Sequence, residues 1–443
     1  MKILNRKRHL TSFQIIISGF ALVILIGTIL LMLPFSAKSG TGTSFSDALF
    51  TATSAVCVTG LIVHDTAAYW SFFGQGIILL LIQIGGMGVV TMAVSIAIVS
   101  GRKISLMQRS TMQEAISAPN MGGIVRLTSF ILKTTIIIEL LGAAIMAPVF
   151  CKDFGVTGIW YALFHSISAF CNAGFDLMGN RAPFSSLTSY SDNIVINVTI
   201  MALIVIGGIG FLTWDDIKGK KLHFKKYRMQ SKVILTVTAV LIVFPAIYFF
   251  FAEFSDMPLK ERLLSSVFQA VTPRTAGFNT ADFTRLTGAG LTIIIVLMLI
   301  GGSPGSTAGG MKTTTLAVLW ASAVAVFRRR SDANFFQRRI PEDTIRNAGA
   351  ILLMYLVLWL TGGVIISSTE GISMMQSLFE TASAIGTVGL SLGITPELGI
   401  LSRIILIILM FFGRVGGLTL IFAAVSNVKS RGLRLPQEKI TVG

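Results

Sequence analysis

Four short stretches of this 443-residue chain resemble one another, and each ends on a glycine. They read SAVCVTG (54–60), SAFCNAG (168–174), VTPRTAG (271–277) and SAIGTVG (383–389), and each lies between two long apolar runs. Four similar loops that dip into a membrane can surround one axis, and a ring of backbone carbonyls around an axis replaces the water shell of a potassium ion. The repetition therefore predicts an ion pathway.

The composition is that of a polytopic membrane protein. The chain is 53% hydrophobic and 13% charged, with a mean hydropathy of +0.79, whereas a soluble protein carries about 25% charged residues. A run of roughly 20 apolar residues can cross a bilayer. The sequence contains eight such runs, at about 12–34, 73–99, 124–149, 193–213, 232–252, 287–327, 348–368 and 399–424.

The formal net charge of +16 comes from an uneven distribution of lysine and arginine. Most of the 36 basic residues fall near five polar segments, at 1–11, 101–123, 214–230, 328–346 and 425–443. Cytoplasmic loops of membrane proteins carry such an excess. We therefore expect a multi-pass protein of the cytoplasmic membrane, with both termini cytoplasmic and the lipid bilayer rather than a nucleic acid as its partner.

Enzymatic and metal-binding motifs are not evident. The apolar run that begins at residue 12 is too long for a signal peptide and is read as the first span. The three cysteines have no disulfide or metal-ligand spacing, and the four histidines do not form a zinc-hydrolase motif. These residues are Cys57, Cys151, Cys171, His9, His64, His165 and His223. We expect neither an enzyme nor an organic cofactor in this chain.

The chain divides into four pseudo-repeats, at 12–100, 124–213, 231–327 and 347–424. Each contains a long apolar helix, a short half-apolar segment, a glycine-ending loop and a second long apolar helix. The short segments, at about 45–56, 159–170, 261–271 and 374–385, have too few residues to cross the bilayer. Surface helices are an alternative that the fourfold repetition disfavours. Irregular backbone at membrane depth lines a cavity, and the carboxyl end of a half-helix favours a cation.

The predicted fold is therefore all-α, with four units of helix, pore loop and helix around one central pore. The carbonyls that would coordinate the ion belong to the last three residues of each loop. They are Val58, Thr59 and Gly60; Asn172, Ala173 and Gly174; Thr275, Ala276 and Gly277; and Thr387, Val388 and Gly389. An inside-negative membrane potential would drive entry with about 2.3 kcal/mol per charge per 100 mV.

A second set of glycine motifs occurs in the last helix of each repeat. GGMG (85–88) and GGIG (207–210) are explained by close helix packing through small residues, and GRVGG (413–417) occupies the same place in the fourth repeat. The third motif begins the run GGSPGSTAGG (301–310). Inside a helix, glycine costs about 1 kcal/mol and proline about 3 kcal/mol relative to alanine, so this run predicts a broken helix and a flexible loop suited to a gate.

The same run is not a phosphate-binding loop, because Met311 separates Gly310 from Lys312. Lys312 and Arg414 are basic residues that lie within apolar spans. A charged residue at membrane depth is a candidate for a functional role. For Lys312, snorkelling to the membrane interface remains an equal alternative. Arg414 is expected to face the pore as a barrier to potassium, whereas Arg403 is expected to be interfacial.

Taken together, residues 10–443 resemble the membrane (ion-translocating) subunit of the Trk/Ktr/HKT potassium-uptake superfamily, most closely the Ktr type. The most specific pieces are FQAVTPRTAGFN (268–279), IQIGGMG (82–88) and FHSISAFCNAGF (164–175). The resemblance implies that Gly60, Gly174, Gly277 and Gly389 are selectivity-filter glycines.

The resemblance also implies a gating loop that Arg414 faces across the pore. This loop would comprise Gly301, Gly302, Ser303, Pro304, Gly305, Ser306, Thr307, Ala308, Gly309 and Gly310. It further implies a homodimer with one pore per protomer, a separate cytoplasmic RCK-type ring that binds ATP or ADP, and sodium as an activator. Cys57 and Gly386 occupy variable filter positions, so the strictness of K⁺ over Na⁺ selectivity stays open.

Two other functions are alternatives to an ion pathway. A sodium- or proton-coupled secondary transporter would need an acidic residue buried at mid-membrane, and the candidates are Glu139 and Glu380. A scaffold or sensor would make no use of four re-entrant loops.

Overall fold

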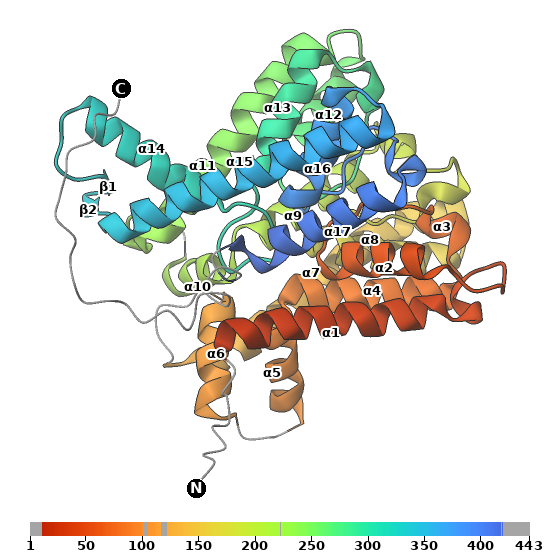
Figure 1. Cartoon of the computed structure of the whole chain (residues 1–443), viewed down its shortest axis with the longest axis horizontal. Helices are drawn as coiled ribbons and strands as arrows, with labels where there is room; N and C mark the ends of the chain where they lie inside the picture. Colours follow the sequence, from red (N-terminus) through yellow and green to blue (C-terminus); the bar gives the residue numbers. More distant parts are fainter. Residues whose placement is uncertain (1–10, 101–103, 117–121, 222, 418, 420–443) are drawn as a thin grey trace, which may run out of the picture.

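The computed structural model describes residues 11–100, 104–116, 122–221, 223–417 and 419. The described part is almost entirely helical (Figure 1). Its two strands, β1 (Asn334–Phe335) and β2 (Arg338–Arg339), pair in an antiparallel hairpin.

The helices repeat the same order four times. We call the second α-helix of each repeat its pore helix: α2 (Phe45–Val56), α8 (Thr157–Phe170), α12 (Leu259–Val271) and α16 (Met374–Gly386). The first repeat contains α1 (Ser12–Met32), α2 (Phe45–Val56), α3 (Thr66–Tyr69), α4 (Phe72–Met87) and α5 (Val89–Val99), and α6 (Leu106–Ile116) follows it. The second contains α7 (Ile124–Phe154), α8 (Thr157–Phe170), α9 (Ile194–Gly208) and α10 (Phe211–Lys220). The third contains α11 (Met229–Tyr248), a π-helical turn (Phe249–Glu253), α12 (Leu259–Val271), α13 (Gly288–Leu299) and α14 (Thr313–Phe327). The fourth contains α15 (Glu342–Glu370), α16 (Met374–Gly386) and α17 (Ile400–Val415).

Short 3₁₀ turns lie in the connections, at Pro34–Ser36, Met178–Asn180, Thr188–Tyr190, Phe224–Lys226, Phe283–Arg285 and Thr395–Glu397. By length and composition, four helical segments of the described part can cross a membrane: α1, α7, α11 with its π-helical turn, and α15. Two bent pairs, α4–α5 and α9–α10, raise this number to six if each pair is one span.

The bends in the first two repeats correct the sequence prediction. We expected one unbroken helix at 73–99 and another at 193–213, with their glycines used only for packing. Instead α4 and α5 meet at 96°, and α9 and α10 meet at 97°. Gly88 and Gly210 stand at these bends with φ of 84° and 92°, a backbone conformation that glycine adopts at little cost. The predicted break in the third repeat is confirmed, because α13 ends at Leu299 and α14 begins at Thr313.

The four repeats form a closed ring. The first helix of each repeat packs on its own pore helix: α1 on α2, α7 on α8, α11 on α12 and α15 on α16. The last helix packs on the pore helix of the next repeat: α4 on α8, α9 on α12, α13 on α16 and α17 on α2. The pore helices consequently lie at the centre of the molecule.

The pore helices carry buried side chains, and the outer helices carry exposed ones. Each pore helix carries a completely buried phenylalanine at an equivalent position: Phe50, Phe164, Phe268 and Phe379. The long outer helices instead expose large apolar side chains, among them Leu22, Ile29, Leu140, Phe244 and Leu353. An exposed apolar surface of this kind suits a lipid environment.

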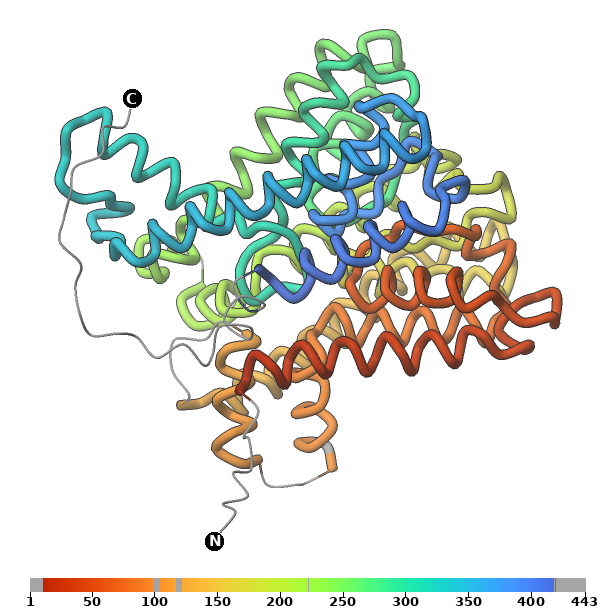
Figure 2. The backbone as a smooth tube through the Cα atoms, viewed as in Figure 1, coloured from red at the N-terminus to blue at the C-terminus, as the bar shows by residue number. Residues whose placement is uncertain are grey.

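The two ends of the helical body differ. In Figures 1 and 2, α5, α6, α10 and the β1–β2 hairpin gather at one end, which we call the basic end. The connection after α1 and the short helix α3 lie at the opposite end. Lys218, Lys220, Arg338 and Arg339 all belong to elements of the basic end.

Candidate functional site

The four glycine-ending loops, which we call the filter loops after their predicted role, meet at the centre of the ring, and their last residues are the filter glycines Gly60, Gly174, Gly277 and Gly389. A Cβ added to Gly60 would lie 2.5 Å from the carbonyl oxygen of Ala173, and one added to Gly174 would lie 2.8 Å from that of Ala276. A Cβ on Gly277 would overlap the carbonyl of Val388, and one on Gly389 would overlap the carbonyl of Thr59. The loops therefore follow one another around an axis in sequence order, and a side chain at any of the four glycines would collide with the next loop.

The loops also share an unusual backbone conformation. The residue two positions before each glycine has a positive φ: 55° at Val58, 57° at Asn172, 72° at Thr275 and 50° at Thr387. The glycines themselves have φ of 90°, 70°, 79° and 94°. Left-handed backbone is uncommon for residues other than glycine and tends to mark functional sites. The first and third of the last three residues in each loop thus have positive φ, and the residue between them has negative φ. In a strand successive carbonyls point to opposite sides, whereas this alternation of φ allows them to point to the same side of the loop.

Each loop is fixed by a hydroxyl at or just after the carboxyl end of its own pore helix, four residues after Phe50, Phe164, Phe268 or Phe379. In the first and fourth repeats, Ser54 Oγ accepts from the amide of Gly60, and Ser383 Oγ accepts from that of Gly389, both at 3.0 Å. In the second and third repeats, Ser168 Oγ donates to the carbonyl of Phe175 at 2.7 Å, and Thr272 Oγ1 donates to that of Phe278 at 2.6 Å. We did not predict these roles, although a hydroxyl residue stands at each of these positions.

The run 301–310 forms an irregular loop that touches the second and fourth repeats, and we call it the gate loop. On one side the amide of Ser303 donates to the carbonyl of Gly208 at 3.0 Å, and the hydroxyl of Thr307 donates to the carbonyl of Phe170 at 2.9 Å. On the other side the amide of Gly310 donates to the carbonyl of Gly413 at 3.1 Å. The loop thus lies directly beneath the carboxyl ends of the pore helices.

The gate loop also reaches the fourth filter loop. A Cβ on Gly309 would overlap the hydroxyl oxygen of Thr387, which is fully buried and has no hydrogen-bond partner in the described structure. A Cβ on Gly310 would lie 2.8 Å from the carbonyl of Gly386. Glycine at these positions lets the gate loop pack closely against the filter loop.

The two basic residues singled out from the sequence both bind the gate loop. Lys312 Nζ donates to the carbonyls of Ala308 at 2.9 Å and Gly309 at 3.3 Å. The Arg414 guanidinium donates to the carbonyl of Thr307 and to those of Gly85 and Gly86, the last at 2.9 Å. Arg414 therefore links the gate loop to the carboxyl end of α4.

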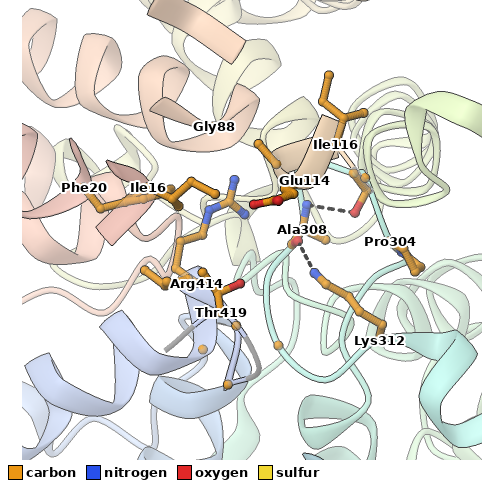
Figure 3. A pocket seen from close by; sticks show the side chains of 18 of the residues that line it. Ile16, Phe20, Gly88, Glu114, Ile116, Pro304, Ala308, Lys312, Arg414 and Thr419 are labelled. Atoms are coloured by element: carbon orange, nitrogen blue, oxygen red, sulfur yellow. Dashed lines mark hydrogen bonds between the residues drawn. The ribbon is translucent and has the colours of Figure 1, made fainter. Parts of the chain in front are cut away.

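Two cavities flank this assembly. A cavity of about 280 Å³ borders the gate loop and is also lined by Glu114 and Ile116 of α6. Figure 3 shows Arg414 and Lys312 on either side of Ala308 in this cavity. A second cavity of about 340 Å³, which we call the vestibule, is lined by all four filter glycines. The vestibule also contains the acidic residues Asp176 and Glu397.

The two buried carboxylates considered for coupled transport have structural partners. Glu139 accepts a hydrogen bond from Gln83 Nε2 at 3.3 Å. Glu380 accepts from Ser391 Oγ at 2.5 Å, from Thr395 Oγ1 at 2.8 Å and from the amide of Leu392 at 3.1 Å. Neither residue lines the two cavities described above.

Arg403, expected at the membrane interface, has partners that we did not predict. Its guanidinium lies 2.6 Å from Asp47 Oδ1 and donates to the carbonyl of Pro396 at 3.0 Å. Asp47 is in the first turn of pore helix α2, so this ion pair joins the last repeat to the first. No local pattern predicts a pair whose members are separated by 356 positions.

Comparison with known proteins identifies the family. The Potassium/sodium uptake protein NtpJ of Enterococcus hirae is 40% identical over 449 residues, which cover 99% of this chain and 98% of that protein. The Ktr system potassium uptake protein B of Bacillus subtilis is 39% identical over 437 residues, which cover 97% and 96%. The solved structure of the potassium transporter TrkH from Vibrio parahaemolyticus shares the fold, with a TM-score of 0.75 and 19% identity over 95% of this chain and 86% of that chain.

These similarities confirm the predicted family and the all-α membrane fold with its four pseudo-repeats. They also confirm that the chain is a transport protein rather than an enzyme. The TrkH family model, described as a cation transport protein, matches residues 4–433. The chain belongs to the TrkH family of cation transport proteins.

Proposed function

We propose that this chain is the membrane subunit of a Ktr/Trk-type system that takes up potassium. The observation that carries this proposal is the convergence of the four glycine-ending loops on one axis. The names of the relatives, a potassium/sodium uptake protein and a Ktr system potassium uptake protein, support the same cation. In this proposal K⁺ is the cargo, and Na⁺ acts as an activator.

The filter works by exchanging water for protein oxygen atoms. The carbonyls of the last three residues of each loop replace the hydration shell of K⁺. The hydroxyls of Ser54, Ser168, Thr272 and Ser383 hold these loops in place, so the protein does not have to reorganise when an ion arrives. The membrane potential supplies the driving force, about 2.3 kcal/mol per charge per 100 mV.

The vestibule is the proposed outer mouth of the pathway. Its carboxylates, Asp176 and Glu397, attract cations, because charge of one sign in a cleft raises the local concentration of counter-ions. The opposite, basic end then faces the cytoplasm, in agreement with the excess of lysine and arginine on cytoplasmic loops. This orientation places both termini and the segments between the repeats in the cytoplasm.

The gate loop is the proposed barrier below the filter. Its backbone lies beneath the pore helices, and the bonds from Lys312 and Arg414 hold it there. The two positive charges also oppose the passage of a cation. Opening requires that the loop leave its contacts with Gly208, Phe170 and Gly413.

The proposed membership of a Ktr/Trk-type system also implies partner proteins. We propose a homodimer with one pore in each protomer, controlled by a separate cytoplasmic ring of RCK-type subunits that bind ATP or ADP. The relatives named as parts of a Ktr system support a multi-component assembly. Coupled secondary transport is the second candidate, but neither Glu139 nor Glu380 lines either of the two cavities, and both accept hydrogen bonds from neighbouring side chains.

The decisive experiment is a flux assay with the purified protein in liposomes. Rubidium or potassium should enter under an inside-negative potential, and excess sodium should compete weakly. Vesicles that remain impermeable to K⁺ both with and without the cytoplasmic subunit would overturn the proposal. Uptake that stops when the sodium or proton gradient is removed, at constant potential, would favour the coupled transporter.

A further inference from the structure

The residue that follows the buried phenylalanine in each pore helix occupies an equivalent position in all four repeats. These residues are Thr51, His165, Gln269 and Glu380. In the last three repeats its side chain bonds to the segment that follows the filter glycine of the same repeat. We call this segment the outer limb of the filter loop.

In the second and third repeats this position holds a histidine and a glutamine, which form different hydrogen bonds to the outer limb. His165 Nε2 accepts from the amide of Leu177 at 3.3 Å, while His165 Nδ1 lies 2.7 Å from the carbonyl of Tyr161. Since a carbonyl only accepts, Nδ1 carries the proton and the ring is neutral. Gln269 Nε2 donates to Thr280 Oγ1 at 3.2 Å. Each side chain thus spans from the pore helix to the outer limb.

The fourth repeat has the strongest form of this contact. The Glu380 carboxylate is completely buried, and it accepts from the Ser391 hydroxyl, the Leu392 amide and the Thr395 hydroxyl. Hydrogen bonds to a charged acceptor are roughly twice as strong as neutral ones. Ser391 and Thr395 both line the vestibule, so a bond network from the pore helix reaches the rim of the filter.

We infer that His165, Gln269 and Glu380 are positioning residues that fix the outer limbs of three filter loops, and that Glu380 sets the selectivity contributed by the fourth loop. The inference rests on the proposed function, because it assigns Glu380 to the same filter. Glu380 acts through Ser391, Leu392 and Thr395 and does not touch the ion. Without these bonds the limb after Gly389 would be free to move, and the carbonyls of Val388 and Gly389 would lose their fixed spacing.

The test compares Glu380→Ala with Glu380→Gln in liposome flux assays. Glu380→Ala removes all three bonds, and we expect the preference for Rb⁺ over Na⁺ to fall by about tenfold or more, which corresponds to the loss of one charge-assisted bond. Glu380→Gln keeps an oxygen acceptor in place and should restore most of the selectivity.

Glu370→Ala is the matched control. Glu370 Oε1 accepts from the amide of Gly399 at 2.9 Å and from the Ser402 hydroxyl at 2.5 Å. It therefore has the same chemistry in the same repeat, but it lies outside the filter and the vestibule lining. Its loss should lower thermal stability without changing selectivity.

The outcomes separate this inference from the proposed function. If the wild-type protein conducts Rb⁺ selectively and Glu380→Ala is equally selective, the positioning role is wrong and the filter assignment survives. If Glu380→Gln loses as much selectivity as Glu380→Ala, the charge rather than the positioning matters, and the inference is also wrong. Should Glu380→Ala fail to fold, the double variant Ser391→Ala/Thr395→Val removes two of the three bonds and must reduce selectivity.

Discussion

The hydroxyl of Thr307 in the gate loop donates a 2.9 Å hydrogen bond to the carbonyl oxygen of Phe170, the last residue of pore helix α8. The proposed gate is therefore bonded directly to a helix that carries a filter loop. Cys171, Asn172 and Ala173 separate this carbonyl from the filter glycine Gly174. In the proposed mechanism, movement of the gate loop breaks this bond before the pathway opens.

Thr307→Val should make the gate easier to open. Valine keeps the shape of threonine but cannot donate, and one neutral hydrogen bond contributes about 1 kcal/mol, so basal Rb⁺ flux should rise by about fivefold. Selectivity should not change. Ser306→Ala is the control, because Ser306 Oγ donates to the Ser303 carbonyl within the loop. Equal flux in the Thr307→Val variant and the wild type would contradict a closing role for this bond.

Arg414→Gln should also raise the basal flux, and by more than Thr307→Val. The guanidinium binds Thr307, Gly85 and Gly86, and each charge-assisted bond contributes about 1.5–3 kcal/mol. Arg403→Gln provides a control on the same helix, since Arg403 pairs with Asp47 at 2.6 Å instead. Rb⁺ uptake into liposomes measures both variants. A flux that falls in Arg414→Gln would show that Arg414 holds the open state.

Gly277→Ser should weaken the preference for potassium over sodium. The residue has φ of 79°, and a Cβ there would overlap the carbonyl of Val388 in the next filter loop. Any residue other than glycine in this left-handed conformation costs about 1–3 kcal/mol. Gly371→Ser introduces the same backbone strain without the clash and is therefore the control. Gly371 has φ of 67°, but its Cβ would meet nothing within 4 Å. Growth of a potassium-uptake-deficient bacterium at low K⁺, with and without Na⁺, reports the selectivity, and unchanged selectivity would count against the filter assignment.

Glu139→Gln should leave both uptake and selectivity near wild-type values. A glutamine at this position still offers an oxygen to Gln83 Nε2, which now donates at 3.3 Å. The assay is Rb⁺ uptake at several sodium concentrations and pH values. Abolished uptake with intact filter selectivity would instead support transport coupled through this carboxylate.

Acidification of the outer solution should reduce the apparent affinity for potassium. The pKa of Asp176 is raised to about 7, chiefly by burial and also by the negative charge of Asp65, while hydrogen bonds from the Met178 amide and Ser186 act in the opposite direction. Below this pH the carboxyl group binds a proton and the vestibule keeps only the charge of Glu397. The KM for Rb⁺ should therefore rise as the pH falls through 7, with little change in maximal flux.

Asp176→Asn should raise the KM at neutral pH and remove its pH dependence. Asparagine retains an oxygen that can accept from the Met178 amide, as Asp176 Oδ1 does at 2.9 Å. Asp192→Asn is the control, because Asp192 is exposed and does not line the vestibule. A KM that follows pH equally in wild type and Asp176→Asn would assign the effect to another group.

Local pattern was enough to predict the pore helices. The first was expected at 45–56 and is α2 (Phe45–Val56), and the fourth was expected at 374–385 and is α16 (Met374–Gly386). Both begin at a serine whose hydroxyl accepts from a first-turn amide, which is a signal that short-range sequence carries. The break after Leu299 was also predictable, because several helix-disfavouring residues occur together.

The bends at Gly88 and Gly210 were not predictable in the same way. A single glycine in an apolar helix is equally compatible with close packing, and here both uses occur: Gly85 packs against Val56, while Gly88 turns the chain. The choice depends on neighbours that are distant in sequence. For the same reason the Arg403–Asp47 pair and the bonds of Glu380 to its outer limb could not be deduced, since each depends on how segments are brought together in space.

The contact of α17 with α2 has a consequence for biosynthesis. The ring lacks part of its wall until α17, the last helix that the structure describes, has left the ribosome and reached the first pore helix. A nascent chain held in the translocation machinery therefore offers no sealed, ion-coordinating passage, and the cell is protected from a leak of its cation gradients while each copy is being made.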